Sequence, residues 1–136
     1  MTLKVTAALL IKSGKVLIAK KTPQDKRANQ WEFPGGKIDL GETPEECLIR
    51  ELREEFNIRI TVDSLFTESL YTHSAGQILV MAYFCTWTSG TLQLTEHATY
   101  RWVYPTELSG YDIVASDAPI ANKLRNEYPS GYIPAH

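Results

Sequence analysis

The chain has 136 residues and a mass of 15.4 kDa, the size of one domain with a core of its own. Its 14 Lys and Arg residues stand against 16 Asp and Glu residues, which gives a net charge of −2 and a pI near 5.9. There is no basic excess to attract a nucleic-acid polymer or an anionic membrane surface. The composition therefore argues against both kinds of partner.

Cysteine usage and hydropathy bear on the location of the protein. Cys47 and Cys85 are too few for a disulfide framework, and their spacing is not that of a zinc site. The sequence shows no signal peptide, and none of its apolar runs approaches the ~18 residues of a membrane span. We therefore expect two reduced thiols in a cytoplasmic protein.

The first part of the chain predicts strands. Residues 5–11 and 16–19 are apolar runs joined by a Ser-Gly turn, which predicts a hairpin. The polar stretch 22–30 predicts an exposed loop. Residues 31–33 then predict a short strand, and the Pro-Gly-Gly-Lys sequence at 34–37 predicts a tight turn.

A helix start is the strongest local signal in the sequence. Thr43 as N-cap, Pro44 at the first helical position and Glu46 three residues after the cap form a capping box. Asn57 predicts the end of the helix, because asparagine tolerates the left-handed conformation that often follows one. The apolar residues between these signals recur at helical spacing: Cys47, Leu48, Leu52 and Phe56.

The second half of the chain is richer in strands than in helices. We expect strands at 58–62, 66–71 and 78–87 (the last one central), a turn at 88–91, a strand at 99–104, a helical start at 105–108, a loop at 110–116, a last helix from Asp117 to Tyr128 and a frayed tail at 129–136. Together these elements predict the α+β class, with a mixed β-sheet and α-helices packed on its faces.

Three carboxylates of the expected helix share one face. Glu51, Glu54 and Glu55 lie at positions i, i+3 and i+4, where like charges repel, and they lie toward the end of the helix that disfavours anions. A bound divalent cation would remove this conflict, and carboxylate oxygens suit Mg²⁺, with Mn²⁺ as the alternative. The other interpretation is a solvated acidic face eased by Arg50 and Arg53.

The same residues belong to a longer pattern. Gly36, Glu42 and residues 50–58 spell Gly-x5-Glu-x7-Arg-Glu-U-x-Glu-Glu-x-Gly-U, where U is apolar, with Asn57 in place of the last glycine. This pattern resembles the Nudix box of the Nudix hydrolase family. The departure at Asn57 is mild, because asparagine suits the same backbone conformation.

The resemblance extends over nearly the whole chain. The lead-in at 31–37 and the spacing of Glu96, Trp102, Asp117 and Pro119 resemble MutT-like pyrophosphohydrolases, especially the branch that acts on cytidine triphosphates. The resemblance implies a single Nudix domain over residues 1–136, with its mixed β-sheet sandwiched between α-helices. It also implies a reaction in which a nucleoside triphosphate and water give a nucleoside monophosphate and pyrophosphate.

The resemblance also implies the roles of individual residues. The metal ligands would be three box glutamates, a backbone carbonyl and a loop glutamate: Glu51, Glu54, Glu55, Gly35 and Glu96. Glu42 would support the junction of loop and helix. The family's catalytic groups fall on Arg50, which orients a glutamate, and on Glu51, Glu54 and Glu96. Whether Glu51 or Glu96 is the general base stays open at this point.

Substrate contacts are expected at Lys21, Phe33, Gly36, Lys37, Tyr71 and Asp117. The lysines would contact phosphates, with Lys37 favoured by its place in the glycine turn, and the aromatic rings would stack on a base. Asp117 would read the base edge: ionised, it accepts from an exocyclic amine such as cytosine N4, and protonated, it donates to a guanine oxygen. Its alternative role is that of a helix N-cap.

The sequence thus predicts a Mg²⁺-dependent hydrolase that clears modified nucleoside triphosphates, modified dCTP or 8-oxo-dGTP, from the nucleotide pool. Its partner would be a small-molecule nucleotide, and the chain would be a monomer or homodimer. One alternative is hydrolysis of a nucleoside diphosphate linked to another group, such as ADP-ribose. An alternative of another class is a Nudix module that senses a nucleotide without turnover.

Overall fold

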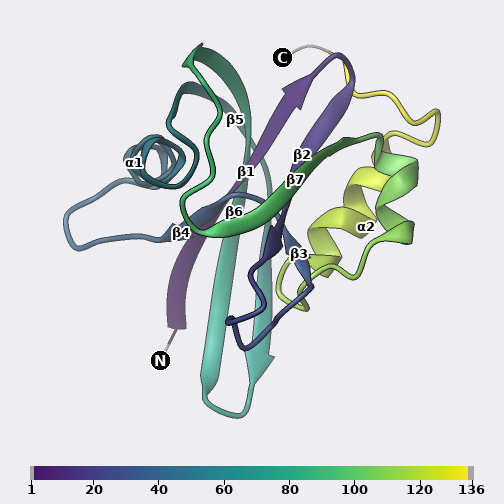
Figure 1. Cartoon of the computed structure of the whole chain (residues 1–136). Coiled ribbons are helices and arrows are strands. Elements are labelled where there is room, and N and C mark those ends of the chain that lie inside the picture. Colours follow the sequence, from purple (N-terminus) through teal and green to yellow (C-terminus); the bar gives the residue numbers. More distant parts are fainter. Residues whose placement is uncertain (1, 135–136) are drawn as a thin grey trace.

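The computed structural model describes residues 2–134 (Figure 1). Its helices and strands follow in this order: β1 (Thr2–Lys12), β2 (Lys15–Lys21), β3 (Trp31–Glu32), β4 (Gly35–Lys37), α1 (Pro44–Phe56), β5 (Ile58–His73), β6 (Gly76–Gly90), β7 (His97–Val103), the 3-10 helix η1 (Pro105–Gly110) and α2 (Ala118–Glu127).

The strands form a mixed sheet. Its order is β3-β2-β1-β6-β5, while β4 pairs with β1 and β7 pairs with β2. Strand β1 runs parallel to β6 and antiparallel to β2 and β4, and β5 runs antiparallel to β6. Figure 1 shows α1 on one side of the sheet and α2 on the other. The predicted α+β class, with a mixed sheet between helices, is confirmed.

Strand β1 is apolar on both faces because a helix covers each of them. Ala7 and Leu9 belong to the core under α2, whereas Ala8 and Leu10 belong to the core under α1. The α1 side is filled by Leu48, Leu52 and Phe56, and the α2 side by Ile120, Ala121 and Leu124. Among residues 2–134, no helix combines the length and the apolar character needed to cross a membrane.

Helix α1 begins and ends as the sequence predicts. The Thr43 hydroxyl accepts from the Glu46 N–H at 3.1 Å, and the Glu46 carboxylate accepts from the Thr43 N–H at 2.9 Å. Asn57 has a left-handed φ of 60°, and its N–H donates to the Arg53 carbonyl at 3.0 Å. Since both signals are local, the start and the end of this 13-residue helix could be read from the sequence.

Strand boundaries differ from the prediction in the second half of the chain. Residues 58–62 and 66–71, predicted as two strands, belong to one strand, β5, with register shifts at three places. At one of these shifts Asp63 steps out of the alternation, and its carboxylate accepts from the Thr86 hydroxyl at 2.8 Å. The expected turn at 88–91 is instead largely the end of β6, and β1, not β6, is the middle strand of the order.

The segment after α2 is anchored, which corrects the prediction of a frayed tail for part of its length. The Ile133 side chain is fully buried in the core under α2, and its N–H donates to the Gly14 carbonyl at 3.0 Å. The ring of Tyr132 lies directly over Gly14, where a Cβ would come within 2.3 Å of it. The last part of the predicted tail, 135–136, lies outside the described residues.

Ile133→Ala should lower the free energy of unfolding by about 2–4 kcal/mol, because it removes a fully buried aliphatic side chain from the core. Denaturant unfolding monitored by circular dichroism measures the change. Leu40→Ala is the matched control, since that side chain is fully exposed. Equal stability of the two variants would show that the segment after α2 does not contribute to the core.

Candidate active site

The two adjacent glycines form a strand, not the turn that the sequence predicts. In β4, Gly35 lies opposite Ala7 and Gly36 lies opposite Thr6 of β1. Gly35 has a φ of 150°, and a Cβ there would lie 2.1 Å from the Thr6 carbonyl oxygen, so only glycine fits. A Cβ at Gly36 would lie 2.6 Å from the carboxyl carbon of Glu51. The glycines therefore bring the backbone of β4 close to both β1 and the acidic face of α1.

Arg50 lies at the centre of that acidic face. Its guanidinium binds Glu42 through two hydrogen bonds of 2.7 and 3.0 Å and also donates to Glu51 at 2.8 Å and Glu54 at 3.1 Å. These bonds from Arg50 are the main reason that the pKa of Glu42 falls to about 2. A further bond to the Lys37 carbonyl, 3.2 Å long, ties α1 to the end of β4. Arg50 thus holds three glutamates, Glu42, Glu51 and Glu54, in fixed places.

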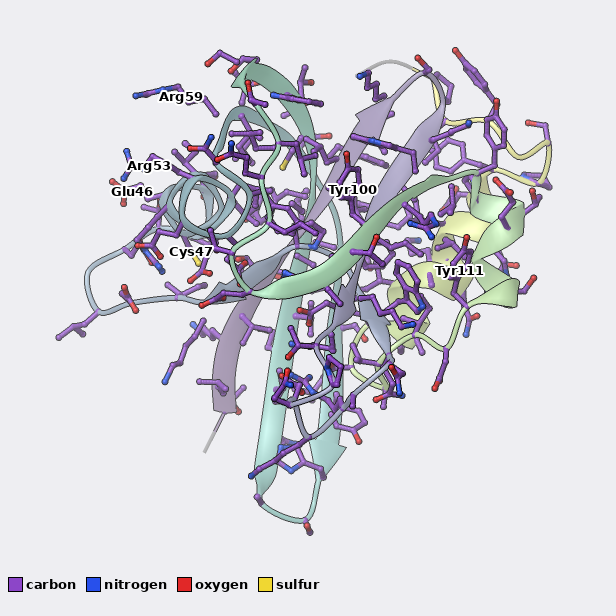
Figure 2. All side chains as sticks on the ribbon, in the orientation of Figure 1. Glu46, Cys47, Arg53, Arg59, Tyr100 and Tyr111 are labelled. Carbon is purple, nitrogen blue, oxygen red and sulfur yellow. The ribbon has the colours of Figure 1, made fainter. Side chains whose placement is uncertain are left out.

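Glu55 is the carboxylate that Arg50 does not reach. Its side chain is 8 % exposed, and its Oε1 is buried without a hydrogen-bond partner in the described part of the chain. Burial above all, with Glu96 and the charge of Glu51 nearby, raises its pKa to about 10. Burial also raises the pKa of Glu51. Arg53 is exposed (Figure 2), and within residues 2–134 the ion pairs to Glu51 and Glu54 come from Arg50, not from Arg53.

Glu96 reaches the acidic face from the loop between β6 and β7. That loop is fastened to the end of α1, because the Gln93 N–H donates to the Phe56 carbonyl at 3.0 Å and the Thr95 N–H donates to the Glu55 carbonyl at 3.1 Å. The Thr95 hydroxyl also donates to the Glu54 carbonyl at 2.9 Å. Glu96 itself is exposed, and its charge contributes to the raised pKa of Glu55.

These residues fit a divalent cation on two observations. Glu55 Oε1 has no hydrogen-bond partner among the described residues, and the absence of a side chain at Gly36 lets the Glu51 carboxylate lie directly against the backbone of β4. A hard cation would complete the coordination of such an oxygen and offset the crowded negative charge. Within residues 2–134, no group of three Asp, Glu, His or Cys side chains is already arranged to coordinate a metal ion. The fit therefore concerns the donor atoms, not a finished coordination shell.

A cavity of about 270 Å³ adjoins the acidic face. Its lining runs from the glycine strand and Glu55 to basic and acidic residues of other elements, among them Lys21, Arg27, Glu32 and Asp117. A hollow of about 500 Å³ at Lys12 and Trp87 is larger but has no carboxylate in its lining. The smaller cavity combines Lys21 and Arg27, which can bind phosphates, with carboxylates that can bind a metal ion. It is therefore the better candidate for a nucleotide.

Of the two predicted phosphate-binding lysines, the structure places only Lys21 in this cavity. Its ammonium group lies 2.9 Å from Glu32 Oε2, and the same oxygen lies 2.8 Å from His97 Nε2. Lys37, which the sequence favoured, is exposed and outside the cavity lining. The sequence analysis assigned no role to Glu32 or His97. Their contact joins residues 65 positions apart, and neither residue lies in a motif of metal-ligand spacing.

Asp117 stands at the N-cap position of α2, but its side chain makes no capping bond. Its Oδ2 accepts instead from the Phe33 N–H at 3.0 Å. Burial first, and the charge of Glu32 second, raise its pKa to about 7. The side chain is 7 % exposed and lines the cavity, so the N-cap alternative is wrong and the carboxyl is free to face a ligand.

The two aromatic rings predicted to stack on a base, those of Phe33 and Tyr71, differ in their burial. Phe33 is part of the cavity lining, but it is 3 % exposed and belongs to the core under α2, so stacking of its ring on a base stays a prediction. The backbone of Phe33 contributes to the site by binding Asp117. Tyr71 is partly exposed, stacks on His73 at 5.7 Å, and lines a hollow that shares Arg27 with the cavity.

A mixed sheet between two helices, with this glutamate-rich helix against a glycine strand, is the arrangement expected of Nudix hydrolases, which act on phosphoric anhydride bonds. The sequence profile of the NUDIX domain matches residues 2–124. The chain therefore belongs to the NUDIX family.

Named relatives agree with this assignment. The CTP pyrophosphohydrolase of Escherichia coli (strain K12) is 35% identical over 119 residues, which cover 87% of this chain and 87% of that protein. The 8-oxo-dGTP diphosphatase of the same strain is 30% identical over 113 residues, covering 83% of this chain and 88% of that protein. The solution structure of the E. coli ORF135 protein matches with a TM-score of 0.80 at 32% identity, over 95% of this chain and 94% of that chain.

The fold alone is shared more widely. The crystal structure of the MutT protein from Methanosarcina mazei Go1 matches with a TM-score of 0.81 at 20% identity, over 93% of this chain and 94% of that chain. At that identity the match supports the architecture of sheet and helices.

The metal-free protein should lose stability between about pH 7 and about pH 9. The folded pKa of Glu55 is about 10 against an ordinary 4.5, so in this range unfolding releases its proton and stability falls as pH rises. A full proton corresponds to about 1.4 kcal/mol per pH unit. Asp117, with a pKa of about 7, contributes mainly below this range.

Thermal unfolding in EDTA measures this effect. Glu55→Gln should show a flatter dependence of Tm on pH than the wild type, because the amide does not ionise. Glu127→Gln, a change in the exposed pair with Lys123, should behave as the wild type does. Parallel curves for the wild type and Glu55→Gln would contradict the assignment of the buried proton.

Proposed function

We propose that the chain is a Mg²⁺-dependent pyrophosphohydrolase that converts a modified nucleoside triphosphate to the monophosphate and pyrophosphate. The observation that carries this proposal is the buried Glu55 carboxyl, which forms no ion pair within residues 2–134 although its face already contains Glu51 and Glu54. A cavity with basic and acidic side chains adjoins this face. The named activities of the two E. coli relatives support the same reaction class.

Mg²⁺, or Mn²⁺ in its place, would be held by Glu51, Glu54 and Glu55 of α1, the Gly35 carbonyl of β4 and Glu96 of the loop. When bound, the ion would neutralise phosphate charge and lower the pKa of a water molecule. Members of this ligand set come from three separate elements. Hydrogen bonds from Gln93 and Thr95 hold the loop at the end of α1, and the close approach of Gly36 to Glu51 holds β4 against the same helix.

The protein's own residues supply positioning and proton transfer. Arg50 orients Glu51 and Glu54 through hydrogen bonds, so their oxygens are presented in fixed directions. The two candidates for the general base have different surroundings. Glu51 is partly buried, and burial raises its pKa above the ordinary value, which makes its carboxylate a stronger base. Glu96 is exposed on a loop that Thr95 fastens to the end of α1.

The other end of the cavity suits the nucleoside. Lys21 offers an ammonium group toward phosphate oxygens, while Tyr71 lies in the neighbouring hollow, where a base could rest on its ring. The Asp117 carboxyl group would form a hydrogen bond with the edge of the base. With a pKa of about 7, Asp117 can accept from an amine or donate to a carbonyl, which supports both modified dCTP and 8-oxo-dGTP. The protein would act on free nucleotides as a monomer or homodimer.

The reaction is tested by product analysis on a panel of nucleotides with Mg²⁺ and with EDTA. Pyrophosphate from triphosphates, formed only with Mg²⁺, supports the proposal. A phosphosugar product from ADP-ribose, without pyrophosphate from any triphosphate, would favour hydrolysis of a linked nucleoside diphosphate. Nucleotide binding without turnover would favour a sensor and contradict the proposed enzyme.

Glu54→Gln should lower kcat by about 100-fold or more while the fold is retained, because its exposed carboxylate would be lost as a charge-stabilising group and not as a packing group. Pyrophosphate release and circular dichroism together measure this. Glu127→Gln serves as the matched exposed control. Near-normal turnover of Glu54→Gln would remove Glu54 from the metal ligands.

Asp117→Asn should change the preference among bases more than the rate on the best substrate. As pH rises through about 7, ionised Asp117 should favour cytosine, whose N4 amine donates, over guanine bases, whose O6 accepts. The asparagine variant should lack this pH dependence. The ratio of kcat/KM for dCTP and 8-oxo-dGTP across pH measures it, and equal losses on all triphosphates would contradict a base-reading role.

A further inference from the structure

His97, the first residue of β7, is held on two sides. Its side chain is 2 % exposed, and its ring stacks on that of Phe56 with centroids 5.2 Å apart and an interplanar angle of 25°. Its Nε2 lies 2.8 Å from Glu32 Oε2 and donates to it, since an ionised carboxylate only accepts. The ring is thus fixed to α1 by its face and to β3 by its edge.

Packing alone does not explain a histidine at this position. Its Nδ1 is buried without a hydrogen-bond partner in the described residues, which costs free energy that an apolar ring would avoid. The Nε2 bond to Glu32 is the interaction that an apolar ring could not make. Glu32 also accepts from Lys21 at 2.9 Å, so its carboxylate is anchored independently of His97.

The position of His97 in the chain connects this contact to the acidic face. His97 follows Glu96, and its stacking partner Phe56 follows Glu55. Within residues 2–134 neither of these two glutamates forms an ion pair. Thr95 fastens the other side of Glu96 to the end of α1. The backbone of Glu96 is therefore fixed from both neighbours.

We propose that His97 is a positioning residue, which uses its bond to Glu32 to hold the Glu96 carboxylate beside Glu55 in the arrangement that a divalent cation needs. This inference rests on the proposed metal site. Residues that orient metal ligands through hydrogen bonds affect metal affinity without touching the metal. A role in packing would depend on the shape of the ring, whereas a positioning role depends on the bond to Glu32.

Two substitutions separate these roles. His97→Phe keeps an aromatic ring against Phe56 but loses the donor, whereas His97→Gln loses the ring but keeps an N–H that can reach Glu32. The readout is Mn²⁺ affinity of the metal-free protein without nucleotide, measured by electron paramagnetic resonance of free Mn²⁺. His97→Phe should weaken binding about 10-fold, and His97→Gln should stay within about twofold of the wild type.

Glu96→Gln and the double variant test whether His97 acts through Glu96. Glu96→Gln alone should weaken Mn²⁺ binding, and adding His97→Phe should weaken it no further. Should His97→Phe fail to fold, Glu32→Ala removes the same bond from β3 and should give the same loss of about 10-fold. Glu127→Gln is the control variant, and thermal unfolding in EDTA verifies that each protein is folded.

Three results would overturn the inference. The first is Mn²⁺ affinity that is retained in His97→Phe but lost in His97→Gln. The second is a double variant whose loss of affinity is the product of the two single losses, and the third is unchanged affinity in Glu96→Gln. Absence of Mn²⁺ uptake by the wild type is a different result. It would overturn the proposed function itself, and the inference with it.

Discussion

The structure depends on one electrostatic constraint: the Glu55 carboxyl group is buried near other carboxylates and, within residues 2–134, forms no ion pair. Arg50 neutralises Glu42 and reaches Glu51 and Glu54, but Glu55 is left with an unpartnered oxygen. Such a group keeps its proton, at a cost, unless a cation is supplied from outside. This constraint is the reason that we propose a metal site, rather than a solvated surface, on the acidic face.

The fold supplies the surroundings that keep this constraint in place. Helix α1 packs against the sheet and buries its apolar side chains there. The caps at Thr43 and Asn57 fix where the glutamates lie along the helix. The glycine strand β4 fits between β1 and α1 because a Cβ at Gly35 would collide with the Thr6 carbonyl. Hydrogen bonds from Gln93 and Thr95 then bring the loop before β7 to the same helix end. Each of these elements is held in place by core packing or backbone hydrogen bonds.

The sequence predicts what is encoded locally. The start of α1 at Thr43 and its end at Asn57 follow from signals within a few residues, and the acidic face follows from helical periodicity. Long-range contacts could not be predicted in this way. Asp117 binds the Phe33 backbone across 84 positions, so both its lost cap and the buried Phe33 ring depend on tertiary packing. The Pro-Gly-Gly-Lys sequence at 34–37 predicted a turn because proline and glycine favour turns, but pairing with β1 makes it a strand.

Calorimetric titration of Mg²⁺ into the metal-free protein, in two buffers of different ionisation enthalpy at about pH 8, tests the central claim most directly. Because Glu55 is protonated at this pH, with a pKa of about 10, binding of the cation should release about one proton per ion. The difference in heat between the buffers measures that proton. Binding without proton release, or no binding with or without a nucleoside triphosphate, would contradict the account.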